Sequence, residues 1–527
     1  MYDVKIENVQ IVDGTGLSPY QAEVGISGAD IAIIGARVGE AERVIDGGGM
    51  VLAPGFIDIH THSEFCLFID HRAESKVRQG VTTEIVGNCG GWVGPLKGKS
   101  LQIAQKRLED LGYVGEIPWS TLAEYIETMQ AEGVSINVGT LVGHGTVRAA
   151  VMGYEDREPT NSELQQMKHH VEESMQAGAF GMSTGIYYAP GSYSGTDELV
   201  ALSEVVRDYG GIHSTHIRDE SNYNIGLTAS IEEVLEIARK SWVSLQISHL
   251  KALGPGVWGS SGELLEMIES AASEGLDVSA DQYPYRASGS SITGALIPRW
   301  AQAGGREEML KRIDDPQSRE KLYQQVEENL RRRGGAESLM IAGYPPEREY
   351  EGLRLSEVAE QVDSTPVQTA LDLLRRADAS FVSFVMDEED VETIMQGDRV
   401  MVGSDGRAVA ACGQLSKGHP HPRYFGTFPR VLGHYRRDRG VVSLQEAVRK
   451  MTSMPAEKLG LTDRGVIREG GRADLVLFDP DTVEDRATFE NPKQCPVGIE
   501  MVMVNGQIVI DDEKHTGACA GEVLRRN

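Results

Sequence analysis

The feature that most constrains the fold is a repeated alternation of short β-rich runs with amphipathic helical stretches through the middle of the chain. Such alternation is typical of parallel βαβ units. The candidate strands are FIDIHTH, TTEIVGN, INVGTLVGH, FGMSTGI, GIHSTHIR, SLQISHL, LDVSADQYPY and RVMVGSD. Eight parallel strands with intervening helices are what a closed barrel requires, so we predict an α/β fold of the (β/α)8, TIM-like type.

Both ends of the chain are β-rich and lack a long helical period. Runs such as VKIENVQIVDG and DIAIIGARVG lie within residues 1–53, and GRADLVLFD and IEMVMVNGQIVI lie within residues 465–527. We therefore predict one small β-sandwich domain built from both termini, with the barrel spanning residues 54–464. A charged run, REEMLKRIDDPQSREKLYQQVEENLRRR, predicts a helical insertion at about residues 287–350, before the last barrel strand.

Composition excludes several classes of partner. The formal net charge of −28 argues against binding to nucleic acid or to an anionic membrane, because both reward clustered Lys and Arg. No stretch is long and apolar enough to span a bilayer, and the first residues do not resemble a secretory signal. The five cysteines are sparse and odd in number, which favours a reducing cytoplasm over a disulfide framework.

Metal-ligand residue types occur at the ends of four predicted barrel strands. Catalytic groups of such barrels come from the C-terminal ends of the strands. The first strand ends with His60 and His62, which share a face because they are two residues apart. Cys89 follows the second strand, and His216 and His249 end the fifth and sixth. Each residue alone is at least as easily explained as a structural one, but together they predict a metal site.

Two further residues near strand ends are treated differently. Asp405 ends the last strand in the run VGSDG, where a carboxylate can touch a metal and accept a proton from its bound water. An isolated GSDG more often forms a turn, but its place at strand eight favours catalysis. His213 lies three residues before His216 and so on the opposite face of its strand, and we leave it out of the site.

The motifs resemble those of the amidohydrolase superfamily and, more closely, of the D-aminoacylase (N-acyl-D-amino-acid deacylase) family. The matching runs include APGFIDIHTH, VGNCG, GMSTGIYYAPGSY, STHIRDE, DQYPY, GSDG, HPRYFGTFPRVLG and EGGRADLVLFDP, and they span nearly the whole chain. The resemblance implies Asp405 as the catalytic acid/base and as a further ligand. It implies Zn²⁺ as cofactor, with one tightly held ion and a weaker second position. The zinc ligands that it implies are His60, His62, Cys89, His216 and His249.

The resemblance also bears on the substrate. It implies that Lys251 and Tyr283 contact a substrate carboxylate, which an ammonium and a phenol can hold together. Arg286 and Ser288 follow in the same loop and are further candidate substrate contacts. The expected substrate is a small N-acyl amino acid.

The expected reaction is zinc-dependent hydrolysis of the amide bond of N-acyl-D-amino acids to a carboxylate and a free D-amino acid. The D configuration rests on the resemblance alone. The alternative is a cyclic-amide hydrolase of the hydantoinase or dihydroorotase type, which has a carboxylated lysine where the resemblance places Cys89. The fourth strand, FGMSTGI, has no lysine, which favours the acyclic substrate. A barrel that had lost its chemistry would be expected to lack a ligand, whereas all six positions are filled here.

Overall fold

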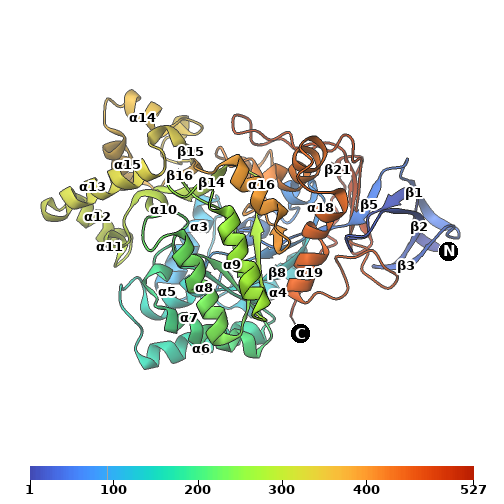
Figure 1. Cartoon of the computed structure of the whole chain (residues 1–527), viewed down its shortest axis with the longest axis horizontal. Coiled ribbons are helices and arrows are strands. Elements are labelled where there is room, and N and C mark those ends of the chain that lie inside the picture. The colour runs from blue at the N-terminus through green and yellow to red at the C-terminus, as the bar shows by residue number, and fades with distance from the viewer. Residues whose placement is uncertain (92, 527) are drawn as a thin grey trace.

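The central part of the molecule consists of parallel strands with helices around them (Figure 1), and the strands form a six-stranded and a three-stranded sheet that together make the barrel. The computed structural model describes residues 1–91 and 93–526. Counting β8 and β9 as one strand gives the eight predicted barrel strands, which are confirmed. They are β6 (Phe56–Asp58), β7 (Val81–Val86), β8 (Asn137–Thr140) with β9 (Val142–Gly143), β10 (Gly181–Gly185), β11 (Ile212–His216), β12 (Ser244–Ile247), β13 (Val278–Gln282) and β17 (Val400–Val402).

The ring closes at two places where the regular pairing is interrupted. The third strand breaks at Leu141, so that β8 pairs with β7 and β9 pairs with β10. The first and last strands join just beyond their ends, where the Asp405 amide donates to the His60 carbonyl at 2.8 Å and the His62 amide donates to the Gly406 carbonyl at 2.8 Å. These bonds make the first and last predicted ligand positions direct neighbours.

Helices surround the barrel, and the longer ones bury one largely apolar face. In α8 (Leu227–Ser241), Leu227, Ile231 and Val234 recur at helical spacing and are buried. The other helices outside the insertion are α1 (Glu64–Ile69), α2 (Glu74–Val77), α3 (Lys99–Asp110), α4 (Leu122–Glu132), α5 (His144–Met152), α6 (Asn161–Gln176), α7 (Thr196–Asp208), α9 (Ser261–Ser273), α16 (Glu388–Gln396), α17 (Arg423–Arg430), α18 (Leu444–Met451) and α19 (Ser453–Leu459).

Both termini contribute to a single nine-stranded sheet at one end of the molecule (Figure 1). The two halves of the chain meet where β18 pairs antiparallel with β5. The sheet consists of β1 (Tyr2–Ile11), β2 (Tyr20–Ser27), β3 (Asp30–Gly35), β4 (Ala41–Asp46), β5 (Val51–Pro54), β18 (Leu475–Phe478), β19 (Ile499–Val504), β20 (Gln507–Asp511) and β21 (Lys514–His515). The joint origin of the β region is therefore observed, whereas its packing as a sandwich and the boundaries at residues 53 and 465 stay predictions.

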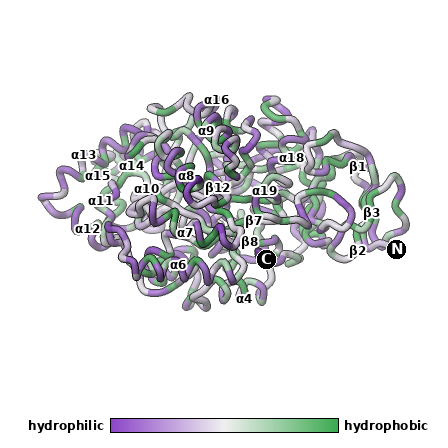
Figure 2. Tube along the Cα trace, turned by 60° about the horizontal axis from the view of Figure 1, so that its bottom comes forward, coloured by the Kyte–Doolittle hydropathy of each residue, from purple (hydrophilic) through white to green (hydrophobic). Residues whose placement is uncertain are grey.

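The insertion lies at the opposite end of the molecule from the nine-stranded sheet, as Figures 1 and 2 show. It begins with β14 (Ala287–Ser291) and ends with β16 (Ser380–Phe384). Between them lie α10 (Ile292–Leu296), α11 (Arg299–Gln302), α12 (Arg306–Asp314), α13 (Pro316–Arg332), β15 (Leu339–Gly343), α14 (Leu355–Gln361) and α15 (Pro366–Arg376).

The prediction of a helical insertion over residues 287–350 was wrong in two respects. The segment extends to Phe384, and it contains a three-stranded antiparallel sheet in the order β14-β16-β15. Its first strand, ASGSS, has no apolar alternation, so its pairing cannot be recognised locally. Buried residues from both parts of the segment, including Leu322, Leu339 and Phe381, form one core, which explains why the later part belongs to the same unit.

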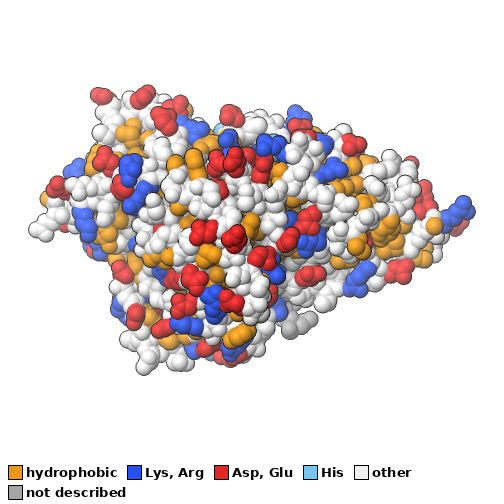
Figure 3. All heavy atoms as spheres, in the orientation of Figure 1, with side chains coloured by type: hydrophobic (Ala, Val, Ile, Leu, Met, Phe, Trp, Pro, Cys, Tyr) orange, Lys and Arg blue, Asp and Glu red, His pale blue; other side chains and the backbone are white. Residues whose placement is uncertain are grey.

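The surface in Figure 3 carries acidic and basic side chains interspersed over the visible face. This distribution fits a solvated surface rather than a basic patch for an anionic polymer. In the part of the chain that the structure describes, no helix combines the length and the apolar character that crossing a membrane requires.

Candidate active site

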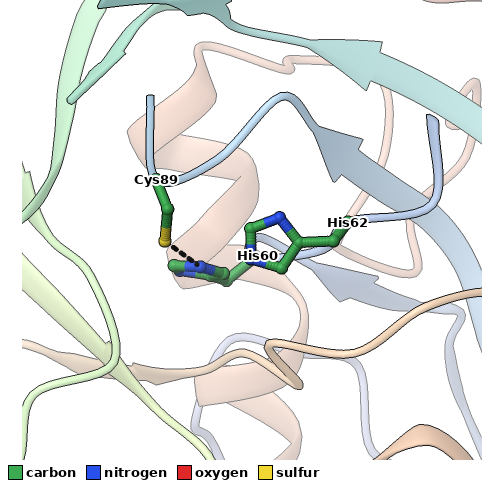
Figure 4. A group of neighbouring side chains, drawn as sticks. All are labelled: His60, His62 and Cys89. Carbon is green, nitrogen blue, oxygen red and sulfur yellow. Dashed lines mark hydrogen bonds between the residues drawn. The ribbon is translucent and has the colours of Figure 1, made fainter. Parts of the chain in front are cut away.

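The structure brings the five predicted nitrogen and sulfur ligands together at the mouth of the barrel. Their donor atoms fall into two groups that share Cys89, one with His60 and His62 and one with His216 and His249. Within each group the donor atoms lie within 4.8 Å of one another. The Cys89 Sγ is 3.4 Å from His60 Nε2 and 3.4 Å from His249 Nε2. Figure 4 shows the sulfur pointing at the His60 ring.

These residues fit a zinc ion in both geometry and chemistry. On a tetrahedral zinc with Zn–S of about 2.3 Å and Zn–N of about 2.0–2.1 Å, sulfur and nitrogen are about 3.5 Å apart. The observed separations of 3.4 Å agree. Both ring nitrogens of His216 are buried without a hydrogen-bond partner, as expected for an imidazole that binds a metal ion. Thiolate and imidazole are also the donors that zinc prefers.

Three of the predicted site residues have a left-handed backbone conformation. The φ angle is 53° at Cys89, 36° at His249 and 47° at Asp405, and each residue comes shortly after a barrel strand. This conformation costs a non-glycine residue about 1–3 kcal/mol and is concentrated at functional sites. At Gly185 in β10, a Cβ atom would lie 2.1 Å from the Cys89 carbonyl oxygen, so glycine allows the Cys89 loop to approach the barrel.

Asp405 lies against the group that contains His60 and His62. One carboxylate oxygen is 3.0 Å from His62 Nε2 and 3.8 Å from His60 Nε2, and the other is 3.0 Å from Arg423 Nη1. Burial opposes ionisation of Asp405, but Arg423 and His62 outweigh it and hold the pKa of this carboxyl well below its usual range. A second carboxylate, Asp281, lies 3.2 Å from His60 Nδ1 and orients that ring from behind.

Glu220 lies against the other group and was missed by sequence reasoning. Its Oε1 atom is 3.2 Å from His249 Nδ1 and 3.4 Å from His216 Nε2, and it forms an ion pair with Lys251. Burial opposes its ionisation, but Lys251 and the two rings hold its pKa well below the usual range. A carboxylate that accepts the Nδ1 proton of His249 leaves Nε2 free to face the sulfur. The sequence feature that could have identified Glu220 was the acidic pair that it forms with Asp219, directly after the predicted fifth strand GIHSTHIR.

Of the predicted substrate contacts, Lys251 and Tyr283 lie beside the donor cluster. The Tyr283 hydroxyl is buried without a hydrogen-bond partner, and its ring lies 5.7 Å from Lys251 Nζ. The Lys251 Nζ is also 2.7 Å from His249 Nδ1. Ser288 is buried on β14 of the insertion. These positions place an ammonium and an unbonded phenol beside the donor cluster.

The structure does not support the prediction for Arg286. Its side chain is 66% exposed and lies 3.4 Å from Glu388, between the buried neighbours Tyr285 and Ala287. Arg423, which sequence reasoning did not select, lies over the Tyr283 ring instead, with 4.6 Å between the guanidinium carbon and the ring centre. The sequence feature that could have identified Arg423 was the motif HPRYFGTFPRVLG, whose first arginine begins α17.

Two other histidines of the barrel lie outside the donor cluster. His213 Nε2 is 2.9 Å from Thr184 Oγ1 and its Nδ1 is 3.3 Å from Ser203 Oγ, in agreement with its predicted orientation away from the mouth. His144 Nε2 lies 2.8 Å from Glu198 Oε1. Both therefore have structural partners of their own.

A parallel barrel whose strand ends gather histidines, a cysteine and an ionised carboxylate defines a metal-dependent hydrolase. The amidohydrolase family matches residues 43–286 and 390–510 of this sequence. The chain therefore belongs to the amidohydrolase family. The match passes over residues 287–389, an interval that contains the whole insertion from β14 to β16.

Full-length relatives place the chain in the D-aminoacylase branch of this family. It is 36% identical over 526 residues to a D-aminoacylase of Alcaligenes xylosoxydans xylosoxydans, covering 100% of this chain and 98% of the relative. It is also 36% identical over 529 residues to an N-acyl-D-glutamate deacylase of the same organism, covering 100% and 97%. Its class is thus that of enzymes that hydrolyse amide bonds.

Solved structures agree with this assignment. A crystal structure of D-aminoacylase superimposes with a TM-score of 0.84 at 35% identity and covers 100% of both chains. An N-acyl-D-glutamate deacylase of Bordetella bronchiseptica, solved with zinc and a phosphonate inhibitor, gives 0.83 at 33% identity and covers 99% of both chains. A D-hydantoinase, at 16% identity and a TM-score of 0.58, shares the fold. The zinc complex supports a metal cofactor for this enzyme as well.

Proposed function

We propose that this enzyme hydrolyses the amide bond of N-acyl-D-amino acids, releasing a carboxylate and a free D-amino acid, with zinc as its cofactor. The observation that carries the proposal is the position of Cys89 between two groups of histidines. The family resemblance implies that this cysteine replaces the carboxylated lysine of cyclic-amide hydrolases, and β10, with the sequence GMSTG, contains no lysine. The relatives that match over the full length act on N-acyl-D-amino acids by name.

We assign the tight zinc position to Cys89, His216 and His249 and the weaker position to His60, His62 and Cys89. The side chains of His216 and His249 are 4% and 2% exposed, whereas that of His62 is 27% exposed. A buried set of ligands excludes competing water and holds an ion more firmly. Zinc at this centre would supply a water of lowered pKa and would polarise the amide carbonyl.

Asp405 is our candidate for proton transfer. Its Oδ1 atom faces His60 and His62, where the attacking water would be held, and Arg423 keeps it ionised. It would accept a proton from the water and then donate it to the nitrogen of the breaking amide bond, because an unprotonated amine is a poor leaving group. The second transfer returns Asp405 to its ionised form.

We propose that Lys251, Tyr283 and Arg423 hold the α-carboxylate of the substrate. The cations flank the Tyr283 ring at 5.7 Å and 4.6 Å, and the Tyr283 hydroxyl has no other partner. A carboxylate that enters this buried mouth would be stabilised by charge-assisted hydrogen bonds. Holding it there would place the acyl nitrogen toward the donor cluster and Asp405.

A substrate screen tests the proposed function. The zinc-loaded enzyme is incubated with N-acetyl derivatives of D- and L-amino acids, with hydantoin and with dihydroorotate, and release of amine or ring opening is measured. We expect turnover of D-derivatives, its loss after removal of zinc by a chelator and its return with added zinc. Turnover of the cyclic amides alone would replace the proposal with the hydantoinase-type alternative.

A further inference from the structure

One buried arginine of the insertion has no carboxylate partner. Arg333, at the end of α13, is 2% exposed. Its Nε donates to the Ala295 carbonyl at 3.2 Å, its Nη1 to Ser383 Oγ at 3.4 Å and its Nη2 to the Tyr187 hydroxyl at 2.9 Å. All three acceptors are neutral, so within residues 1–91 and 93–526 nothing neutralises this charge at ion-pair distance.

The other buried arginines show how unusual this is. Arginine is rarely buried unless it is paired, because removing its charge from water is costly. Four arginines are buried in the described chain, and three of them contact a carboxylate. The pairs are Arg148 with Glu198, Arg423 with Asp405 and Arg464 with Asp474. Arg333 is the exception, and an anion from outside the chain would supply the missing countercharge.

The position of Arg333 links it to the candidate active site on two sides. Its partner Tyr187 lies against His216, with 5.0 Å between the ring centres. Its partner Ser383 on β16 is directly opposite Ser288 on β14, and opposite residues of antiparallel strands present their side chains on one face. Through Tyr187 the guanidinium is connected to a predicted metal ligand, and through Ser383 to a predicted substrate contact.

A second polar group at this place also lacks a partner. The Tyr223 hydroxyl is buried without a hydrogen bond to any described residue, and its ring centre is 5.5 Å from the Arg333 guanidinium carbon. Each terminal nitrogen of Arg333 carries two N–H groups and donates one hydrogen bond to a described residue, which leaves one N–H on each nitrogen for a further acceptor. An ionised carboxylate can accept from both residues and neutralise the charge.

We infer that Arg333 and Tyr223 receive the side-chain carboxylate of the substrate, so that the enzyme prefers N-acyl derivatives of the acidic D-amino acids. This inference rests on the proposed function, which assigns the α-carboxylate separately to Lys251, Tyr283 and Arg423. A substrate with two carboxylates would be held at both places, with its amide bond between them and the metal centre.

The test compares specificity constants of the zinc-loaded enzyme for N-acetyl-D-glutamate, N-acetyl-D-aspartate, N-acetyl-D-methionine and N-acetyl-D-leucine. We expect the wild type to prefer at least one acidic substrate by roughly tenfold or more over both apolar ones. Arg333→Met should lower kcat/KM for the acidic substrates by about 100-fold, because it leaves a buried carboxylate unpaired. The same variant should change the values for the apolar substrates by less than about fivefold.

Two further variants complete the design. Arg331→Met, on the same helix but with a side chain 73% exposed, is the matched control and should change neither class of substrate. Tyr223→Phe removes only an unbonded hydroxyl, so it should fold even if Arg333→Met does not. It should raise KM for the acidic substrates by about tenfold, which is the usual weight of one lost hydrogen bond to a charge.

Two results would overturn the inference. One is a wild type that prefers the apolar substrates, and the other is an equal loss on both classes in Arg333→Met or, should that variant be insoluble, in Tyr223→Phe. Failure of the proposed function looks different, because then none of the four N-acetyl-D-amino acids would be hydrolysed by any form of the enzyme.

Discussion

The two halves of the donor cluster share Cys89 but differ in their surroundings. The half with His60 and His62 is partly open, with the His62 side chain 27% exposed, and it adjoins Asp405. In the half with His216 and His249, both imidazoles are buried. His60 is itself buried, so the difference in solvent access between the two halves lies at His62.

The carboxylates of the two halves are engaged differently. Asp405 has one oxygen toward the histidines and the other toward Arg423, so one of its oxygens faces the reaction space. Glu220 has a single oxygen shared among His216, His249 and Lys251, which suits it to orient the two rings. Under the proposed function, this difference assigns tight metal binding and proton transfer to opposite sides of one barrel mouth.

Removal of the shared sulfur should abolish zinc binding in both halves of the donor cluster, so it should give the largest effect on activity. In Cys89→Ala we expect zinc content to fall close to zero and kcat/KM to fall by about 10⁴-fold or more, since the activated water is lost with the ion. Elemental analysis after gel filtration and a turnover assay measure the two quantities. Cys412→Ala, at an exposed cysteine, is the control and should alter neither. Stoichiometric zinc in Cys89→Ala would refute the thiolate assignment.

Asp405→Asn should separate chemistry from metal binding. Because the amide can neither accept nor donate the required proton, we expect kcat to fall by roughly 10²–10⁴-fold while the tight zinc remains. Steady-state kinetics and zinc content are measured on the same preparation. Near-normal turnover would exclude Asp405 from proton transfer, and loss of all zinc would show that it is a main ligand of the tight ion instead.

A pair of alanine variants tests whether the halves differ as their burial suggests. His216→Ala should weaken the tight zinc by about 100-fold or more, because it opens the buried position. His62→Ala should leave that affinity within about tenfold and remove only the weaker second ion. Competition with a chromophoric chelator gives both affinities. Equal weakening in the two variants would mean that the cluster binds zinc as one undivided site.

The smallest effect concerns His213, on the same strand as His216 but facing away from both halves. Burial lowers the pKa of His213 to about 3, against about 6.5 in an unfolded chain. The unfolded chain therefore takes up a proton first as the pH falls, so stability is lost below about pH 6.5. The expected loss from this group between pH 7 and pH 5 is roughly 2 kcal/mol.

His213→Gln should remove this part of the pH dependence, even if it lowers stability at both pH values through its lost contacts with Thr184 and Ser203. Denaturant unfolding of both forms at pH 7 and pH 5, with zinc removed from both, isolates the difference. An identical pH dependence in the two forms would show that His213 takes up a proton as readily in the folded state as in the unfolded chain.

Much of the fold and of the donor cluster could be predicted from the sequence because the relevant signals are local. Each barrel strand is a short buried run, and its C-terminal end marks the mouth wherever the strand lies in the ring. His60, His216 and His249 could therefore be placed without knowing any distance between strands. The prediction for Arg286 failed because the direction of a loop side chain depends on what packs around it, and no local period records that.

Only the tertiary structure determined which residues surround the predicted metal ligands. It showed that Cys89 belongs to both groups, that Arg423 at the start of α17 reaches Asp405, and that Arg333 of the insertion contacts Tyr187 beside the mouth. These are contacts between side chains on different elements, whose strength depends on burial and on the charges nearby. Backbone periodicity determines the element on which a residue lies, whereas packing determines which charge it meets.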